Sequence, residues 1–83
     1  MNPKLPQEAA VIGEFEKNSK EVVRVSLQQY AGNDVLNLRI FYRDSNGEWK
    51  PGKDGITIRA AQFPQLAALL SDAGKALKEF GVI

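Results

Sequence analysis

Arginine and aromatic side chains recur at strand spacing in two neighbouring segments of the chain. Arg24 and Tyr30 belong to EVVRVSLQQY, and Arg39 and Phe41 belong to VLNLRIFYR. Guanidinium groups can follow phosphates, and aromatic rings can stack on unpaired bases at roughly 1–3 kcal/mol per base. These residue types favour a surface for a single-stranded nucleic acid. The alternative is an ordinary solvent-exposed sheet face whose aromatic rings pack across strands.

Covalent and metal chemistry lack most of the groups that they need. The 83 residues include no histidine and no cysteine, which removes thiolate nucleophiles, Ser–His pairs and the usual zinc ligands. The acidic pairs Glu14/Glu16 and Asp44/Glu48 are typical of exposed strand edges and turns. The glycines of GEWKPG do not match the GxxxxGK[ST] phosphate loop. We therefore expect no enzyme, no cofactor and no metal site.

The charge and hydropathy of the chain set limits on its partners and location. The net charge is +1, and residues 17–59 carry eight basic and five acidic side chains, an excess of +3. This excess is a mild indication of a polyanion partner. The sequence shows neither a long apolar run nor a signal peptide. We expect an intracellular protein with no membrane partner, in the nucleoid or cytoplasm of a bacterium or in the nucleus of a eukaryote.

Alternation with a period of two predicts strands at residues 21–30 and 35–43. One face of this pair is apolar and holds Val23, Val25, Leu27, Leu36, Leu38 and Ile40. The other face holds Val22, Arg24, Ser26, Gln28, Tyr30, Val35, Asn37, Arg39, Phe41 and Arg43. Residues 31–34 and 44–47 have turn composition. We expect an edge strand at 11–16, a Gly/Pro loop at 47–56 and a last short strand at 55–59.

The period changes to that of a helix after residue 60. The apolar stripe comprises Phe63, Leu66, Leu70, Ala73, Leu77 and Phe80, and Gly81 supplies a stop. Strands followed by one helix predict an α+β fold with the helix against one sheet face. The face with the arginines would then stay open. Residues 1–10 are expected to form a flexible tail, and residues 11–83 a single domain.

With these elements placed, the chain resembles the single-stranded-DNA-binding domain of the positive cofactor four (PC4-like) transcriptional coactivators over about residues 11–80. IGEFEKNSKEVVRVSL resembles the opening strands of that family. LNLRIFYRDSNGEWKPGKDGI resembles its arginine strand and the loop that follows, and ITIRAAQFPQLAALL resembles the entry to its helix. The resemblance implies a curved four-stranded antiparallel sheet followed by one C-terminal helix, assembled as a homodimer.

The resemblance also assigns roles to individual residues. It implies base stacking by Tyr30 and Tyr42, backbone contact by Arg39, and basic loop positions at Lys50 and Lys53. Strict alternation places Phe41, not Tyr42, on the face of Arg39, and a β-bulge would reconcile the two. The candidate nucleic-acid-binding residues are therefore Arg24, Tyr30, Arg39, Phe41, Tyr42, Lys50 and Lys53.

We thus expect a homodimer that binds single-stranded DNA with little sequence preference. It would act in transcription regulation or genome maintenance, with the transcription machinery as a further partner. Asp34 and Asp54 stand where the family has basic residues, and fewer phosphate contacts should lower both the affinity and its salt dependence. Two alternatives stay open: an RNA-binding protein, and a protein-interaction module with reduced nucleic-acid affinity.

Overall fold

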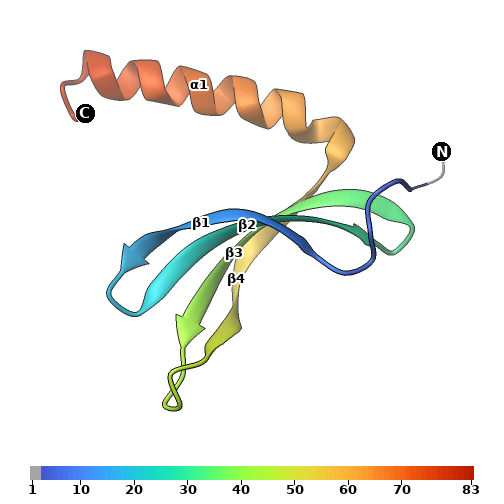
Figure 1. The fold of residues 1–83 in the computed structure, drawn as a ribbon. Coiled ribbons are helices and arrows are strands. Elements are labelled where there is room, and N and C mark those ends of the chain that lie inside the picture. The colour runs from blue at the N-terminus through green and yellow to red at the C-terminus, as the bar shows by residue number, and fades with distance from the viewer. Residues whose placement is uncertain (1–2) are drawn as a thin grey trace.

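The computed structural model describes residues 3–83, which form four strands followed by one helix (Figure 1). The elements are β1 (Ala10–Asn18), β2 (Glu21–Tyr30), β3 (Asn33–Arg43), β4 (Trp49–Arg59), a 3-10 turn (Ala60–Gln62) and α1 (Phe63–Glu79). The strands form one antiparallel sheet in the order β1-β2-β3-β4, and the sheet arches strongly. The predicted α+β fold, a curved four-stranded antiparallel sheet with a C-terminal helix, is confirmed.

The hairpin of β2 and β3 forms the centre of the sheet. Its register runs from Glu21 opposite Tyr42 to Tyr30 opposite Asn33 without a shift. The turn is shorter than predicted, because only Ala31 (φ 50°) and Gly32 (φ 80°) lie outside the strands. Two successive positive φ angles define the tight hairpin turn whose twist matches that of the flanking strands. This turn fixes which residues of β3 lie opposite Arg24 and its neighbours.

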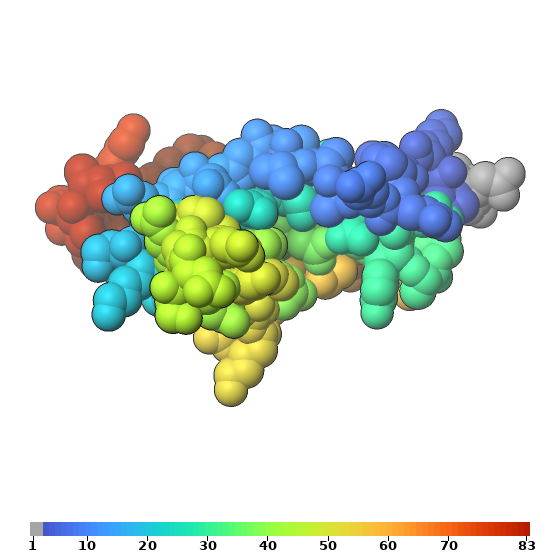
Figure 2. Space-filling model, turned by 60° about the horizontal axis from the view of Figure 1, so that its bottom comes forward, coloured from blue at the N-terminus to red at the C-terminus, as the bar shows by residue number. Residues whose placement is uncertain are grey.

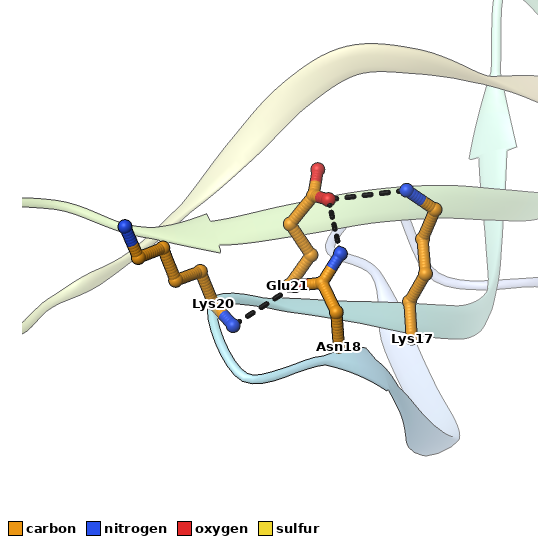
Figure 3. A network of polar contacts seen from close by, with 4 residues as sticks. All are labelled: Lys17, Asn18, Lys20 and Glu21. Atoms are coloured by element: carbon orange, nitrogen blue, oxygen red, sulfur yellow. Dashed lines mark hydrogen bonds and ion pairs between the residues drawn. The ribbon is translucent and has the colours of Figure 1, made fainter.

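A compact polar network closes the turn between β1 and β2 (Figure 3). Asn18 Nδ2 donates to Glu21 Oε1 at 2.8 Å, and Lys17 Nζ forms an ion pair with the same oxygen at 3.1 Å. The backbone N–H of Lys20 donates to Asn18 Oδ1 at 2.9 Å. The hydrogen bond from Asn18 and then that from Lys17 lower the pKa of Glu21. The network stabilises the turn at residues 19–20, and β1 extends past its expected bounds on both sides.

The last strand differs most from expectation. The loop predicted at 47–56 is wrong, because β4 already begins at Trp49 and the connection comprises only residues 44–48. The Asp44 carboxylate accepts the N–H groups of Asn46 and Glu48, each at 2.9 Å, and so caps the turn. β4 is an edge strand, and Pro51 is tolerated there because only one side of the strand must donate to the sheet. Figure 2, seen from below, shows the β3–β4 hairpin standing out from the sheet.

A β-bulge in β4 requires a close approach to β3. Arg39 pairs with Gly55 and Phe41 pairs with Pro51, so that residue 40 alone faces residues 52–54. An added Cβ at Gly55 would lie 2.5 Å from the Leu38 carbonyl oxygen. Backbone cannot move aside as a side chain can. Glycine at this position is therefore a requirement of the bulge.

The helix makes few contacts with its own sheet. In Figure 1, α1 runs along one side of the sheet and separates from it after the first turn. The buried apolar side chains of residues 3–83 are Val22, Val35 and Leu36, all in β2 and β3, and α1 contributes none. The prediction that the helix packs against a sheet face is therefore wrong for the single chain. Its apolar stripe is exposed, from Phe63 near the sheet to Phe80 at the far end.

We expect Gly55→Ala to lower the free energy of unfolding by about 1–3 kcal/mol, because the new methyl group must displace β3 backbone. Gly13→Ala is the matched control, since Gly13 lies in β1 and its added Cβ meets nothing within 4 Å. Urea unfolding at one protein concentration measures both. Equal midpoints for the two variants would contradict the close approach.

Candidate nucleic-acid interface

The register gathers polar side chains on one face of the sheet, which also carries the buried Val22 and Val35. Arg24 lies opposite Arg39, and Asn37 lies between Ser26 and Thr57. A hollow of about 290 Å³ opens on this face, lined by Gln28, Tyr30, Asn37, Arg39 and Thr57. These residues come from β2, β3 and β4. The polar face is thus open at this hollow, as the alternation predicted.

Tyr30 and Arg39 are the two candidate residues that line this hollow together. Tyr30 ends β2 and is 65% exposed, so one side of its ring is free for a ligand. Arg39 is half-buried, and its Nη1 donates to the carbonyl oxygen of Gly52 at 3.2 Å. The bulge in β4 thereby holds this guanidinium group in place. A fixed cation beside an exposed ring suits a ligand with both charge and aromatic surface.

Arg24 and Phe41 lie on the same face but are engaged with each other. The Arg24 guanidinium carbon lies 4.0 Å from the centre of the Phe41 ring, a cation–π contact. Arg24 Nε also donates to Glu14 Oε2 at 2.8 Å. A base that stacks on Phe41 from this side would have to displace Arg24. The pair is therefore less accessible than Tyr30 and Arg39.

Tyr42, Lys50 and Lys53 do not join the hollow beside Tyr30. The bulge lies in β4, whereas the β2–β3 register is continuous, so Tyr42 stays on the opposite face from Arg39. It lines a second hollow of about 410 Å³ that Lys53 shares. Lys50 pairs with Tyr42 across the strands, and its Nζ lies 3.3 Å from Glu48 Oε2. The seven candidates therefore divide into two groups.

Trp49 lies on the polar face, although its sequence context indicated a loop. It pairs with Arg43, whose guanidinium carbon lies 5.7 Å from the centre of the indole ring. The indole is 37% exposed. The omission of Trp49 from the candidates follows from the misplaced start of β4. Strand alternation counted back from Arg59 would have placed it on this face, because the bulge adds two residues and so keeps the period.

Three side-chain hydrogen bonds cross the floor of the hollow. Thr57 Oγ1 donates to Asn37 Oδ1 at 2.6 Å, and Asn37 Nδ2 donates to Gln28 Oε1 at 2.9 Å. Gln28 Nε2 then donates to the carbonyl oxygen of Gln7 at 3.3 Å. We call Gln28, Asn37 and Thr57 the amide ladder. Alternation placed Gln28 and Asn37 on this face, but only the register shows that they touch.

Asp34 is turned toward the N-terminal segment and not toward the hollow. Its carboxylate accepts the backbone N–H of Leu5 at 2.9 Å and that of Lys4 at 3.0 Å. The hydrogen bond from Leu5, then that from Lys4, lowers the pKa of Asp34. The Gln29 N–H donates to the Pro6 carbonyl oxygen at 2.7 Å. Within the tail predicted at 1–10, these residues are thus bonded to the hairpin, while residues 1–2 lie outside the described part.

The described residues contain neither a metal site nor a membrane-spanning helix. Across residues 3–83, no three acidic, histidine or cysteine side chains come together in a way that could hold a metal ion. None of the helical segments in the same range has the length and apolar character of a membrane crossing.

The fold and the polar face together place the chain in a class of small proteins that have a four-stranded sheet, one C-terminal helix and aromatic and cationic side chains on the sheet. The chain belongs to the family described as "Transcriptional Coactivator p15 (PC4)", whose model matches residues 17–69. The matched range covers β2, β3, β4 and the first part of α1. The resemblance seen in the sequence is thereby confirmed.

Related proteins come from a fungus, a bacterium and a phage. The chain is 32% identical over 59 residues to the RNA polymerase II transcriptional coactivator SUB1 of Saccharomyces cerevisiae, and the match covers 70% of this chain. It spans only 20% of that protein's length. A PC4 homolog from Burkholderia pseudomallei, BPSL1147, superimposes with a TM-score of 0.72 at 25% identity, covering 81% of this chain and 98% of the homolog.

The phage relative shows the same fold. The bacteriophage T5 homolog of the eukaryotic transcription coactivator PC4, implicated in recombination-dependent DNA replication, gives a TM-score of 0.61 at 24% identity. The alignment covers 90% of this chain and 83% of the phage chain. Proteins with this fold therefore occur in settings that differ in the process that they serve.

Asp34 provides a pH-dependent test of the N-terminal attachment. Its folded-state pKa lies below the ordinary value of 3.8, so the ionised carboxylate stabilises the fold above that value. This contribution is lost as the pH falls through the folded-state pKa. We expect Asp34→Asn to melt below the unsubstituted protein at neutral pH and to match it in strong acid. Thermal midpoints measured against pH test this.

Asp54→Asn is the control for that experiment. Asp54 shows no hydrogen bond or ion pair within residues 3–83, so its substitution should leave the midpoint nearly unchanged at every pH. A constant difference between Asp34→Asn and the unsubstituted protein, persisting into strong acid, would contradict the role of the charge.

Proposed function

We propose that this chain binds single-stranded DNA as a homodimer with little sequence preference, in transcription regulation or genome maintenance. The protein acts by binding and not by catalysis, and the transcription machinery is a further partner. It works wherever strands are separated, in the nucleoid or the nucleus according to its host. The relatives support the setting, since one is a transcriptional coactivator and another is implicated in DNA replication.

The observation that carries the proposal is the exposed ring of Tyr30 beside the fixed guanidinium of Arg39. Both line one hollow on the polar face, where the Tyr30 side chain is exposed. A flipped-out base stacks on Tyr30, and Arg39 neutralises the phosphate next to it. Neither the stacking nor the phosphate contact depends strongly on which base is bound. A duplex would be bound more weakly, because its paired bases expose no face for stacking.

The remaining candidates extend this contact along the strand. Trp49 with Arg43 continues the polar face past Phe41 toward the end of the β3–β4 hairpin. Tyr42 and Lys53 line the other side of that hairpin, and Lys50 lies beside them. We propose that a strand leaving the polar face bends round the hairpin and meets these residues there. Arg24 and Phe41, which already contact each other, support the face between the two ends.

The small buried area of a single chain supports the proposed homodimer. The radius of gyration is 15.1 Å, whereas a compact domain of this length has about 12 Å. No side chain in residues 3–83 is completely buried, and Leu69 and Leu70 are 67% and 59% exposed. An apolar hollow of about 660 Å³ lies between the sheet and the start of α1. The helix of a second copy is the occupant that we propose for the exposed apolar surface.

We expect Tyr30→Ala to weaken binding to oligo-dT by about 1–3 kcal/mol, the contribution of one stacked base. Tyr30→Phe keeps the ring and should bind nearly as well as the unsubstituted protein. Fluorescence anisotropy with labelled oligo-dT and a matched duplex, at two salt concentrations, measures the affinities. Equal and very weak binding to both probes would refute the proposal, and tighter binding of oligo-U would indicate RNA as the ligand.

Leu70→Asp tests the dimer, because it places a charge in the apolar stripe of α1. We expect the variant to elute at the mass of one chain at micromolar concentration, and the unsubstituted protein at twice that mass. Lys75→Asp introduces the same side chain on the other side of the helix and should stay dimeric. Size-exclusion chromatography with light scattering makes the measurement. A single-chain mass for the unsubstituted protein would exclude the dimer.

A further inference from the structure

The amide ladder has a direction that one backbone group determines. The carbonyl oxygen of Gln7 can only accept a hydrogen bond, so Gln28 must turn its Nε2 toward it. Gln28 Oε1 then faces Asn37 and requires Nδ2 there. Asn37 Oδ1 consequently faces Thr57, whose hydroxyl group has to donate. Reversal of either amide would set two oxygens against each other. The carbonyl oxygen of Gln7, which precedes β1, therefore fixes the direction of the whole ladder.

This polarity decides which hydrogen-bonding groups face the hollow beside Tyr30. Each ladder amide uses one of its two N–H groups and has its oxygen occupied by the neighbour's hydrogen. The second N–H of Gln28 and that of Asn37 are not used within the ladder. Thr57 Oγ1, which keeps its acceptor lone pairs, lies on β4 at the end of the ladder away from Gln28. Tyr30 lies two residues from Gln28 on the same face, at the donor end.

We infer that the amide ladder gives the Tyr30 hollow a modest preference for thymine, uracil or guanine, which carry a keto oxygen at the ring position where cytosine or adenine carries an exocyclic amino group. This inference rests on the proposed function, because it concerns a base already stacked on Tyr30. The oxygen of the base accepts the free N–H of Gln28 or Asn37. An amino group of the base at the same position would turn its own N–H toward the N–H of the side-chain amide, and two donors form no hydrogen bond. Gln28 and Asn37 are specificity-determining residues, whereas Tyr30 and Arg39 supply most of the affinity.

Oligo-deoxyuridine and oligo-deoxycytidine of equal length isolate this effect. Their bases differ in the keto or amino substituent at carbon 4 and in the protonation of the adjacent ring nitrogen. We expect the dissociation constant of the deoxyuridine oligomer to be lower by about threefold to tenfold, which corresponds to one net hydrogen bond. Gln28→Leu should bring the ratio of the two constants close to one. Its affinity for oligo-deoxycytidine should change little, since stacking and phosphate contacts remain.

Gln29→Leu is the matched control, because Gln29 is the neighbouring half-buried glutamine of β2 and points to the other face. It should keep the full ratio. Asn37→Leu is the second variant and should also reduce the ratio, and thermal midpoints show that each variant is folded. Equal constants for the unsubstituted protein, or an undiminished ratio in both folded ladder variants, would overturn the inference. Absence of binding to either oligomer would instead refute the proposed function.

Discussion

The pairing of β2 with β3 is the constraint on which the rest of the structure depends. Because side chains alternate along a strand, a slip of one residue in one partner would break up both faces. The turn at Ala31 and Gly32 prevents that slip, since it leaves two residues for the reversal and gives both a positive φ. Arg39 consequently lies opposite Arg24, and Asn37 lies near Gln28. The part of the polar face that β2 and β3 form follows from this alignment.

A second constraint is that the sheet has only one layer. The helix leaves the sheet after its first turn, and so the apolar side of the helix remains exposed and the centre of the apolar sheet face is mostly half-buried. Small chains bury a limited fraction of their surface even when compact, and this chain is extended. The proposed association with a second copy would cover α1 and the apolar hollow beside Phe63. The polar face lies on the other side of the sheet and would stay accessible in such an arrangement.

The edge strand β4 links the fold to the candidate interface. Its bulge sets Gly55 against the backbone of β3, and the carbonyl oxygen of Gly52 then holds the guanidinium of Arg39. On the N-terminal side of the bulge, the register of β4 places Trp49 opposite Arg43. At the opposite edge, the segment before β1 orients Gln28 through the Gln7 carbonyl. Both edges of the sheet therefore help to define a site that lies between them.

The sequence by itself determined the strand and helix order, the two faces of β2 and β3, and the family. Those features depend on local alternation and on a motif, LNLRIFYRDSNGEWKPGKDGI, that can be read without contacts. Only the tertiary structure decided that residues 49–54 form a strand, because glycine and proline indicate a loop unless an edge position accepts them. It also decided that Tyr42 lies apart from Arg39 and that the helix leaves its own sheet. A bulge and a missing second layer are properties of pairing and packing, and no local pattern encodes them.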